Sequence, residues 1–254
     1  MLSLGEHDCH VAEVFGPGRF TSRCSAFNLK PGSAFDLRNG HDFDLSADRK
    51  KALDILETEK PALVIGSPKC APWSSMQNLV PNSPEKEARV KQGLRHMTFM
   101  ADIYRRQVEA GRMFLHEQPK TATSWNLPVI KRIAALPGVV RVDCDQCAYG
   151  LVAEDVDGLA PVLKPTGWLT NSELIAAELQ LRCPGCDRHC NLMRRVSADV
   201  WRVVERYPRK LVTAILRGLC KELRRAGTIF ALEAGQHADP ADIWETFPEY
   251  YEAV

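Results

Sequence analysis

Short apolar runs alternate with longer amphipathic stretches over the first 145 residues of the chain. Five apolar runs, bounded by turn-forming or polar residues, predict buried β-strands. They lie at 11–16, 33–37, 61–67, 112–119 and 139–144. Apolar residues at helical spacing predict helices over 47–60 and 85–111. This alternation predicts an α/β fold with a doubly wound, mostly parallel sheet.

The predicted strands end on residues that can bind a ligand or react. Gly16 and Gly18 follow the first strand, Asp36 ends the second, Cys70 follows the third and Glu117 ends the fourth. The carboxyl ends of parallel strands share one edge of the sheet, where doubly wound folds bind their ligands. We therefore expect one ligand site bordered by these residues.

The loop after the first strand suits a cofactor that carries a nucleoside. Gly16 and Gly18 lack a Cβ, so a ligand can approach the backbone closely. About twenty residues further on, Asp36 can accept hydrogen bonds from a ribose diol. The Gly-Pro-Gly spacing differs from the dinucleotide fingerprint, and a simple turn is the alternative interpretation.

Cys70 and Glu117 are the candidate reactive groups at this edge. A loop thiol can act as a nucleophile where a cation such as Lys69, or a helix N-terminus, lowers its pKa. The alternative is that Cys70 packs as a small apolar residue, which is the commoner role of cysteine. Glu117 can act as an acid or a hydrogen-bond partner, and its alternative role is an ordinary loop carboxylate.

In this order, the motifs resemble those of the cytosine carbon-5 DNA methyltransferases. EVFGPGRFT resembles the cofactor loop, Asp36 the ribose acid, GSPKCAPWS the nucleophile loop and FLHEQP the glutamate motif. The helix ERYPRKLVTAILRGL resembles the last motif, which completes the cofactor pocket. These motifs are similar in sequence to those of the divergent branch found in retroelements and other mobile or viral genomes. The resemblance covers roughly residues 11–150 and 205–220.

The resemblance implies a Rossmann-like class I methyltransferase that uses S-adenosylmethionine. It implies that the Cys70 thiolate adds to carbon 6 of cytosine, that Glu117 stabilises the developing charge, and that Gln146 belongs to the catalytic set. The cofactor-binding residues that it implies are Phe15, Gly16, Gly18, Asp36, Leu37, Ser67 and Pro68. A base in a duplex must be flipped out, or presented single-stranded, to reach such a site.

Three motifs depart from the pattern of that family. Pro68-Lys69-Cys70-Ala71 stands where the family has Pro-Pro-Cys-Gln, and Glu117-Gln118-Pro119 stands where it has Glu-Asn-Val. Of the expected Gln-x-Arg-x-Arg motif, Gln146 matches and both arginines are missing. Arg141, on the preceding predicted strand, is the candidate replacement.

The segment LRCPGCDRHCNL has the spacing of a zinc knuckle. Cys183, Cys186, His189 and Cys190 lie within it, and Cys-x2-Cys can place two thiolates on one zinc ion. Adjacent residues seldom bind one ion together, so we expect either His189 or Cys190 as the third ligand. The fourth is then Cys144 or Cys147. Reduced thiols in a small core and an iron–sulfur cluster are the alternatives.

Composition and charge suggest the partners and the division of the chain. Nine cysteines, no long apolar run and no signal-like N-terminus predict a thiol-bearing intracellular protein that does not enter membranes. Residues 182–225 hold 12 Lys and Arg against 4 Asp and Glu, and residues 226–254 hold none against 6. We predict a catalytic core at 1–155, a small target-recognition and zinc region at 156–200, a returning helix at 201–226 and an acidic tail at 227–254.

The basic region predicts a nucleic acid partner, most plausibly DNA. Arg182, Arg188, Arg194 and Arg195 surround the knuckle and suit phosphate contacts. Trp168 can stack on a base or fill the core. Two other functions compete with DNA methylation. One is a zinc-stabilised nucleic-acid-binding protein with an inactive core, which the missing arginines favour. The other is methylation of RNA or of a pyrimidine nucleotide.

Overall fold

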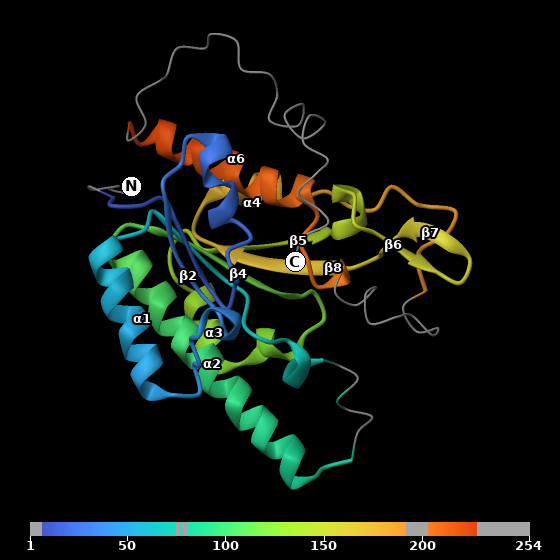
Figure 1. Ribbon diagram of the computed structural model, residues 1–254, viewed down its shortest axis with the longest axis horizontal. Helices are drawn as coiled ribbons and strands as arrows, with labels where there is room; N and C mark the ends of the chain where they lie inside the picture. The colour runs from blue at the N-terminus through green and yellow to red at the C-terminus, as the bar shows by residue number, and fades with distance from the viewer. Residues whose placement is uncertain (1–6, 75–76, 78–80, 192–202, 228–254) are drawn as a thin grey trace.

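The computed structural model of the protein describes residues 7–74, 77, 81–191 and 203–227. Its centre is a six-stranded sheet in the order β2-β1-β3-β4-β8-β5 (Figure 1). The strands are β1 (Val11–Val14), β2 (Pro31–Phe35), β3 (Leu63–Gly66), β4 (Met113–Pro119), β8 (Pro165–Thr170) and β5 (Val140–Asp145). β1, β2, β3 and β4 pair in parallel, and β8 runs antiparallel to both β4 and β5.

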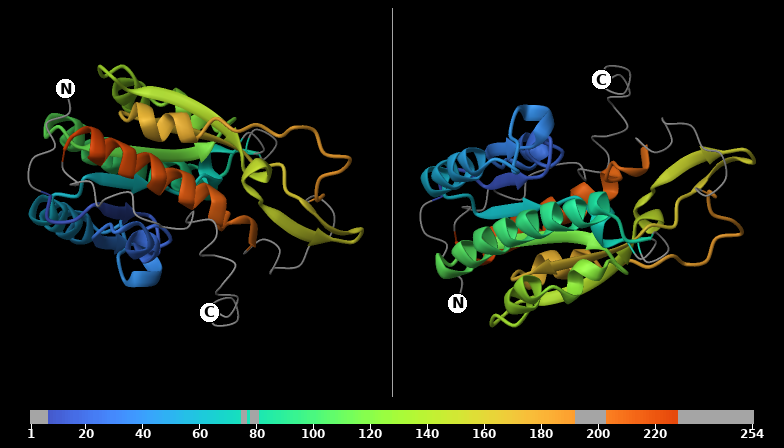
Figure 2. Two further views of the ribbon diagram at one scale, coloured as in Figure 1. Left: turned by 90° about the horizontal axis from the view of Figure 1, so that it is seen from above. Right: turned by 90° about the horizontal axis from the view of Figure 1, so that it is seen from below.

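Helices cover both faces of this sheet, as Figures 1 and 2 show. On one face lie α1 (Ser46–Glu59), α2 (Pro84–Glu109) and α3 (Pro128–Ala134). On the other lie the 3₁₀ helix η1 (Thr21–Phe27), α4 (Glu173–Glu178) and α6 (Arg209–Arg225). Successive residues of a strand face opposite sides, so Leu63 and Ile65 enter one core and Val64 enters the other. Burial on both faces explains why β3 has the sequence of an unbroken apolar run.

All five predicted strands and both predicted helices are confirmed within a few residues at their ends. The prediction that 156–200 forms a separate small region differs from the structure. β8 completes the central sheet, and α4 packs against α6 in the main core. The sequence of β8, PTGWLT, contains proline and glycine and does not look like a strand. β8 forms a strand because it pairs with β4 on one side and with β5 on the other.

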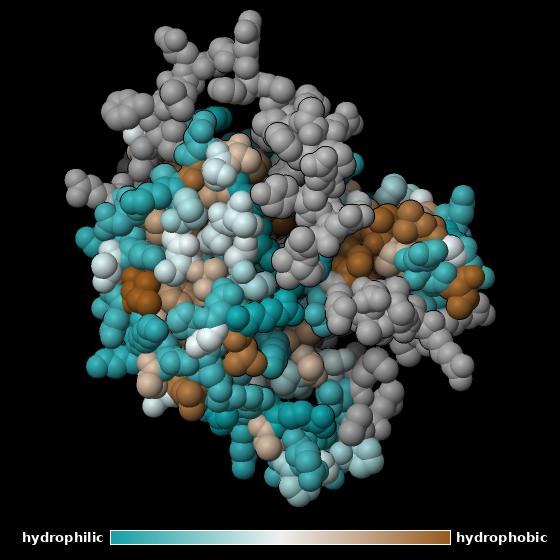
Figure 3. Space-filling view, viewed as in Figure 1, coloured by the Kyte–Doolittle hydropathy of each residue, from teal (hydrophilic) through white to brown (hydrophobic). Residues whose placement is uncertain are grey.

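A two-stranded hairpin stands outside the central sheet. β6 (Val152–Asp155) pairs with β7 (Gly158–Pro161), and the hairpin projects from one end of the molecule (Figure 2). Apolar side chains gather on the hairpin in Figure 3. Val156 is 66% exposed and Leu159 is 71% exposed. Its inner side forms a small third core with Cys190 and Val204.

The order of the strands reverses between β1 and β3. The chain leaves β1 for β2 on one side and then returns to β3 on the other side. At such a reversal the two connecting loops separate, and doubly wound folds bind ligands there. The loops over 15–20 and 67–73 both begin at this point. Among the described residues, no helix has the length and apolar character needed to cross a membrane.

Candidate active site and metal site

A buried carboxylate holds the loop after β1 in place. Glu13 is 2% exposed and accepts hydrogen bonds from the backbone N–H groups of Arg19 (3.0 Å), Phe20 (2.8 Å) and Thr21 (2.7 Å). The Glu13 side chain passes under Gly16, where an added Cβ would lie 2.6 Å from its carboxylate. Glycine at position 16 is therefore required by this contact.

Two residues of the same loop have a positive φ angle. Gly18 has φ +101°, which side-chain-bearing residues rarely adopt, and Phe15 also has a positive φ of 60°. Next to this loop, Asp36 follows β2 and accepts a hydrogen bond from the Arg38 N–H (2.9 Å) through one carboxylate oxygen. Leu37, beside it, is 62% exposed. The predicted cofactor-binding residues at 15–18 and 36–37 thus follow two paired strands.

The loop that carries Cys70 is fastened to β4. Gln118 is fully buried, and its Nε2 donates a hydrogen bond of 2.6 Å to the Pro68 carbonyl. The Ser124 hydroxyl in turn donates to Gln118 Oε1 (3.2 Å). Gln118 therefore joins the Cys70 loop to β4. The fixed backbone at Pro68 presents Cys70 as an exposed residue at the start of a 3₁₀ turn.

Glu117, on β4, is the buried acid of the site. It is 9% exposed, and burial raises the pKa of its carboxyl. The Lys164 ammonium, the Tyr207 hydroxyl and the Arg19 guanidinium oppose that rise in pKa. The Tyr207 hydroxyl donates to Glu117 Oε2 at 3.2 Å. The site thus holds a carboxyl that keeps its proton to a higher pH than an exposed glutamate does.

Glu117 lies close enough to Cys70 to influence the ionisation of its thiol. Although Cys70 reaches the surface, the protein around its thiol displaces part of the water and raises the thiol's pKa, and the Glu117 carboxylate raises it further. The Lys164 ammonium lowers the same pKa. Lys164 also donates to the Val204 carbonyl at 2.9 Å. Lys69, which we expected to assist the thiol, instead acts on His96.

Gln146 and Arg141 do not occupy the positions expected of them. Gln146 is fully buried and donates to Thr166 Oγ1 at 2.8 Å, so its side chain is enclosed by protein. Arg141 donates to the Lys120 carbonyl (2.9 Å) and stacks on Trp125, with 4.1 Å from guanidinium to ring centroid. The cation that faces Cys70 and Glu117 is Lys164, which comes from the loop before β8.

A group of metal-ligand side chains lies just beyond the carboxyl end of β5. Cys147, Cys183 and His189 offer ligand atoms that all lie within 4.8 Å of one another. The Cys183 Sγ is 3.3 Å from His189 Nε2 and 3.7 Å from Cys186 Sγ. This group can hold a metal ion. An ion bound here would join the 183–189 segment to Cys147, which follows β5.

Cys190 and Cys144, the other two predicted ligands, have different surroundings. Cys190 is 7% exposed and packs in the small core under the hairpin with Leu151 and Val162. Cys144 is fully buried and its sulfur accepts a hydrogen bond from Trp168 Nε1 (3.2 Å). Both are core cysteines, and Trp168 is likewise a core residue. Of the predicted third and fourth ligands, the structure brings His189 and Cys147 to Cys183, whereas Cys190 and Cys144 lie in the cores.

The arginines near this cluster are held by acidic side chains. Arg182 lies 3.7 Å from Asp143 and 3.6 Å from Asp145. Arg188 lies 3.0 Å from Asp155 and also donates to carbonyls of the β6–β7 turn. These two guanidinium groups fasten the segment to the sheet and to the hairpin. Arg194 and Arg195 lie outside the described residues.

Three residues of the site were not found from the sequence: Glu13, Lys164 and Tyr207. Glu13 lies inside an apolar strand, where an acid is unusual, and that was an available signal. Lys164 and Tyr207 precede elements far along the chain, and nothing in their local sequence links them to Glu117. Comparison of the chain with protein-family models and with curated proteins finds no match.

Proposed function

We propose that the protein is an S-adenosylmethionine-dependent methyltransferase that acts on carbon 5 of cytosine in DNA through a covalent bond to Cys70. The observation that carries the proposal is the meeting of a loop thiol and a proton-holding carboxyl beside a glycine loop at the reversal of strand order. Cys70 and Glu117 follow or end neighbouring parallel strands, and their charges interact. The motif order in the sequence supports the same function.

The cofactor proposal rests on the loops after β1 and β2. Gly16 permits the close contact with Glu13, whose hydrogen bonds to the N–H groups of residues 19–21 hold the loop beside the ends of the strands. Asp36 commits one carboxylate oxygen to the Arg38 N–H and can offer the other to a ribose hydroxyl. Exposed Leu37 offers an apolar surface to an adenine ring. When bound here, S-adenosylmethionine would supply an electrophilic methyl group.

The chemistry assigned to the protein side chains begins with cytosine, whose carbon 5 is a poor nucleophile. The Cys70 thiolate forms a bond to carbon 6, and the electron pair of the 5,6 double bond moves to carbon 5. Glu117 donates a hydrogen bond or its proton to the ring nitrogen, where negative charge develops. After carbon 5 accepts the methyl group, it loses its proton to a base and the Cys70–carbon 6 bond breaks. The thiolate leaves and the ring regains its double bond.

The charges around the site suit these two roles. Burial raises the pKa of the Glu117 carboxyl and so favours its protonated form. Lys164 favours the thiolate of Cys70 against the effects of burial and Glu117, and so takes the part of the missing arginines. A nucleophile that is thiolate and an acid that is protonated are both needed at once.

Methyl transfer from labelled S-adenosylmethionine tests the proposal. The protein is incubated with duplex DNA, single-stranded DNA, RNA or cytidine nucleotides, and the nucleosides are analysed by mass spectrometry. Label on carbon 5 of deoxycytidine is the expected result. Label only on RNA or on free nucleotides would show that DNA is not the substrate. Nucleic acid binding without methyl transfer would favour an inactive methyltransferase-like core.

The proposal includes one structural zinc ion, bound by Cys147, Cys183, Cys186 and His189. Two thiolates on a tetrahedral zinc ion, each about 2.3 Å from the metal, lie about 3.8 Å apart, and a thiolate and an imidazole nitrogen lie about 3.6 Å apart. The distances of 3.7 Å and 3.3 Å in the structure are close to these values. Three thiolates and one imidazole are a common zinc donor set.

Removal of one ligand is expected to abolish zinc binding. Protein purified under reducing conditions should contain about one zinc ion per chain, and Cys183→Ser should contain only background metal. Cobalt substitution should show the charge-transfer absorption of three thiolates. The matched control is Cys190→Ala, next to His189, which should keep the metal. Loss of zinc in the control and its retention in Cys147→Ala would show that the ligand set is wrong.

A further inference from the structure

Tyr207 connects the end of β3 to the acid on β4 through its hydroxyl group. The Tyr207 oxygen lies 2.8 Å from Ser67 Oγ and 3.2 Å from Glu117 Oε2. A phenol has one proton to donate, and it is donated to the carboxylate oxygen, which can only accept when ionised. The Ser67 hydroxyl must then donate to Tyr207. While Glu117 is ionised, the contacts therefore form a chain of hydrogen bonds that runs from Ser67 to Tyr207 to Glu117.

We propose that Ser67 and Tyr207 form a relay that orients the Glu117 carboxyl, so that Oε2 accepts from Tyr207 while Oε1 carries the proton that is offered to the substrate. This inference rests on the proposed function for the identity of the substrate atom. Among the described residues, no donor faces Oε1, and this atom is not among the buried polar atoms that lack a partner. Oε1 is thus the oxygen left open to a ligand.

The direction of the relay decides which oxygen holds the proton. If Oε2 carried it, the chain would run in reverse, with Oε2–H donating to Tyr207 and Tyr207 donating to Ser67, so the proton would be committed to Tyr207 and the open oxygen could only accept. With the proton on Oε1, Oε2 is a carbonyl oxygen and accepts from Tyr207. A proton on the open oxygen can reach a ring nitrogen directly. Tyr207 is in this sense a positioning residue, because it acts on the substrate through Glu117.

Several charged or titratable groups face Glu117 from the surrounding elements. They are Arg19 from the loop after β1, Cys70 from the loop after β3, Tyr104 from α2, Cys144 from β5, Lys164 from the loop before β8 and Tyr207 from the segment before α6. Lys164 and Arg19 favour the ionised carboxyl, as does the Tyr207 hydrogen bond. Loss of the Tyr207 hydroxyl alone should therefore move the titration of Glu117 to higher pH.

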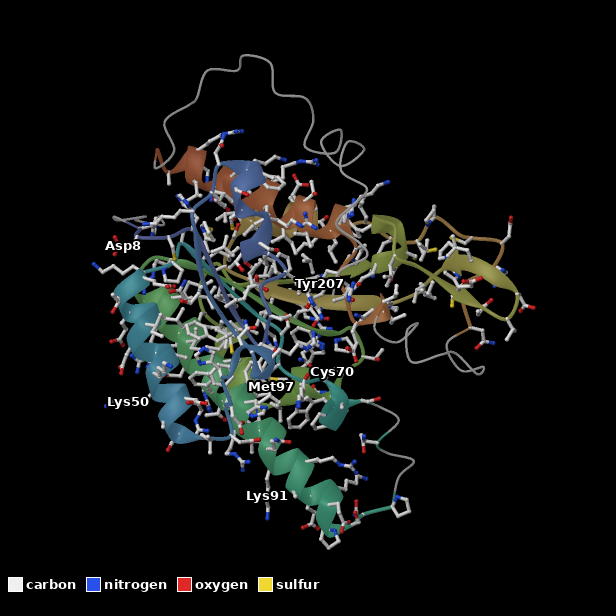
Figure 4. The ribbon with its side chains drawn as sticks, viewed as in Figure 1. Asp8, Lys50, Cys70, Lys91, Met97 and Tyr207 are labelled. Carbon is white, nitrogen blue, oxygen red and sulfur yellow. The ribbon has the colours of Figure 1, made fainter. Side chains whose placement is uncertain are left out.

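The backbone around Tyr207 is held by the same parts of the chain that build the site. Arg19 donates to the Glu205 carbonyl, and Lys164 donates to the Val204 carbonyl at 2.9 Å. The Tyr207 ring lies 5.4 Å from the Phe20 ring in the loop after β1. Figure 4 shows Tyr207 and Cys70 in the central part of the molecule. The entry to α6 is thus part of the site, and it links the glycine loop to Glu117.

Infrared difference spectroscopy on the full chain tests the relay. The carbonyl stretching band of protonated Glu117 is identified by its absence in Glu117→Gln, and is followed as pH changes. In Tyr207→Phe we expect the band at higher wavenumber, because its oxygen loses a donor, and its titration midpoint at higher pH. Ser67→Ala should shift both in the same direction by a smaller amount. In the methyl-transfer assay, Tyr207→Phe should lower kcat about 10-fold with KM for DNA little changed.

Tyr149→Phe is the matched control, because it removes a half-buried hydroxyl that bonds to the Glu178 carbonyl (2.7 Å) and not to Glu117. The Glu117 band should be unchanged in this variant. A folded Tyr207→Phe with the wild-type band and midpoint would overturn the relay. If Tyr207→Phe does not fold, an unchanged band in Ser67→Ala overturns it instead. Shifted bands in a protein that methylates nothing would contradict the proposed function and support the relay.

Discussion

Replacement of Cys70 by alanine is expected to abolish methyl transfer and covalent capture of DNA. Without the thiolate, carbon 6 has no nucleophile and carbon 5 is not activated, so the transfer rate should fall by at least about 10³-fold. Capture is measured with an oligonucleotide that carries 5-fluorocytosine, because fluorine at carbon 5 cannot leave as a proton does and the adduct persists. The wild-type protein should give a stable protein–DNA band on a denaturing gel, and Cys70→Ala should give none.

Cys220→Ala is the control for this experiment, since Cys220 lies on α6 and is mostly buried, with its thiol near the Phe27 carbonyl. It should form the adduct at the wild-type rate. The rate of capture should also rise with pH, because burial and Glu117 raise the pKa of the Cys70 thiol and so move the formation of its thiolate to higher pH. An adduct that forms equally well in Cys70→Ala would remove this residue from the mechanism.

Replacement of Glu117 by glutamine is expected to lower the transfer rate by about 10²- to 10⁴-fold. The amide keeps the size of the side chain but has no carboxyl proton to give to the ring nitrogen. Single-turnover transfer to a cytosine-containing duplex measures the effect. Cys70 remains in place, so slow capture of the 5-fluorocytosine oligonucleotide should still be detectable.

The fold of Glu117→Gln should be at least as stable as that of the wild type at neutral pH. The pKa of Glu117 is raised in the folded protein, so its contribution to stability is present at low pH and is lost as pH rises through that pKa. A neutral amide avoids this loss. Glu109→Gln, which removes an exposed carboxylate that pairs with Arg105, is the control and should transfer at the wild-type rate. Equal rates in the two variants would show that Glu117 has no part in the reaction.

The strands and the chemistry at their ends could be predicted because both signals are local. The run at 61–67 is apolar since both faces of β3 are covered, and the same stretch shows where the strand stops and where Cys70 follows. The predicted strand at 112–119 was correct for the same reason. The predicted strand at 139–144 was also correct, although β5 lies at the edge of the sheet and is largely exposed or half-buried. Once parallel pairing is assumed, the order of these elements brings their carboxyl ends to one edge.

β8 could not be predicted, because no local pattern identifies it. Its residues include Pro165 and Gly167, and the strand exists through its pairing with β4 and β5. Gly167 is needed there because an added Cβ would lie 2.8 Å from the Trp125 ring. As a consequence, the predicted region 156–200 had the wrong boundary. Lys164, just before β8, was also not connected with Cys70.

The sequence by itself determined which residues could react, namely a thiol and an acid at strand ends and a set of soft ligands at knuckle spacing. The tertiary structure decided which of them meet. Glu117 and Tyr207 are 90 positions apart, and Ser67 and Tyr207 are 140 apart. Burial of Gln146 and Cys190, and the approach of Cys147 to Cys183, likewise depend on distant packing. Local residue patterns record the propensity for strands and helices, whereas side-chain contacts and pKa shifts arise only when separate segments exclude water from the same space.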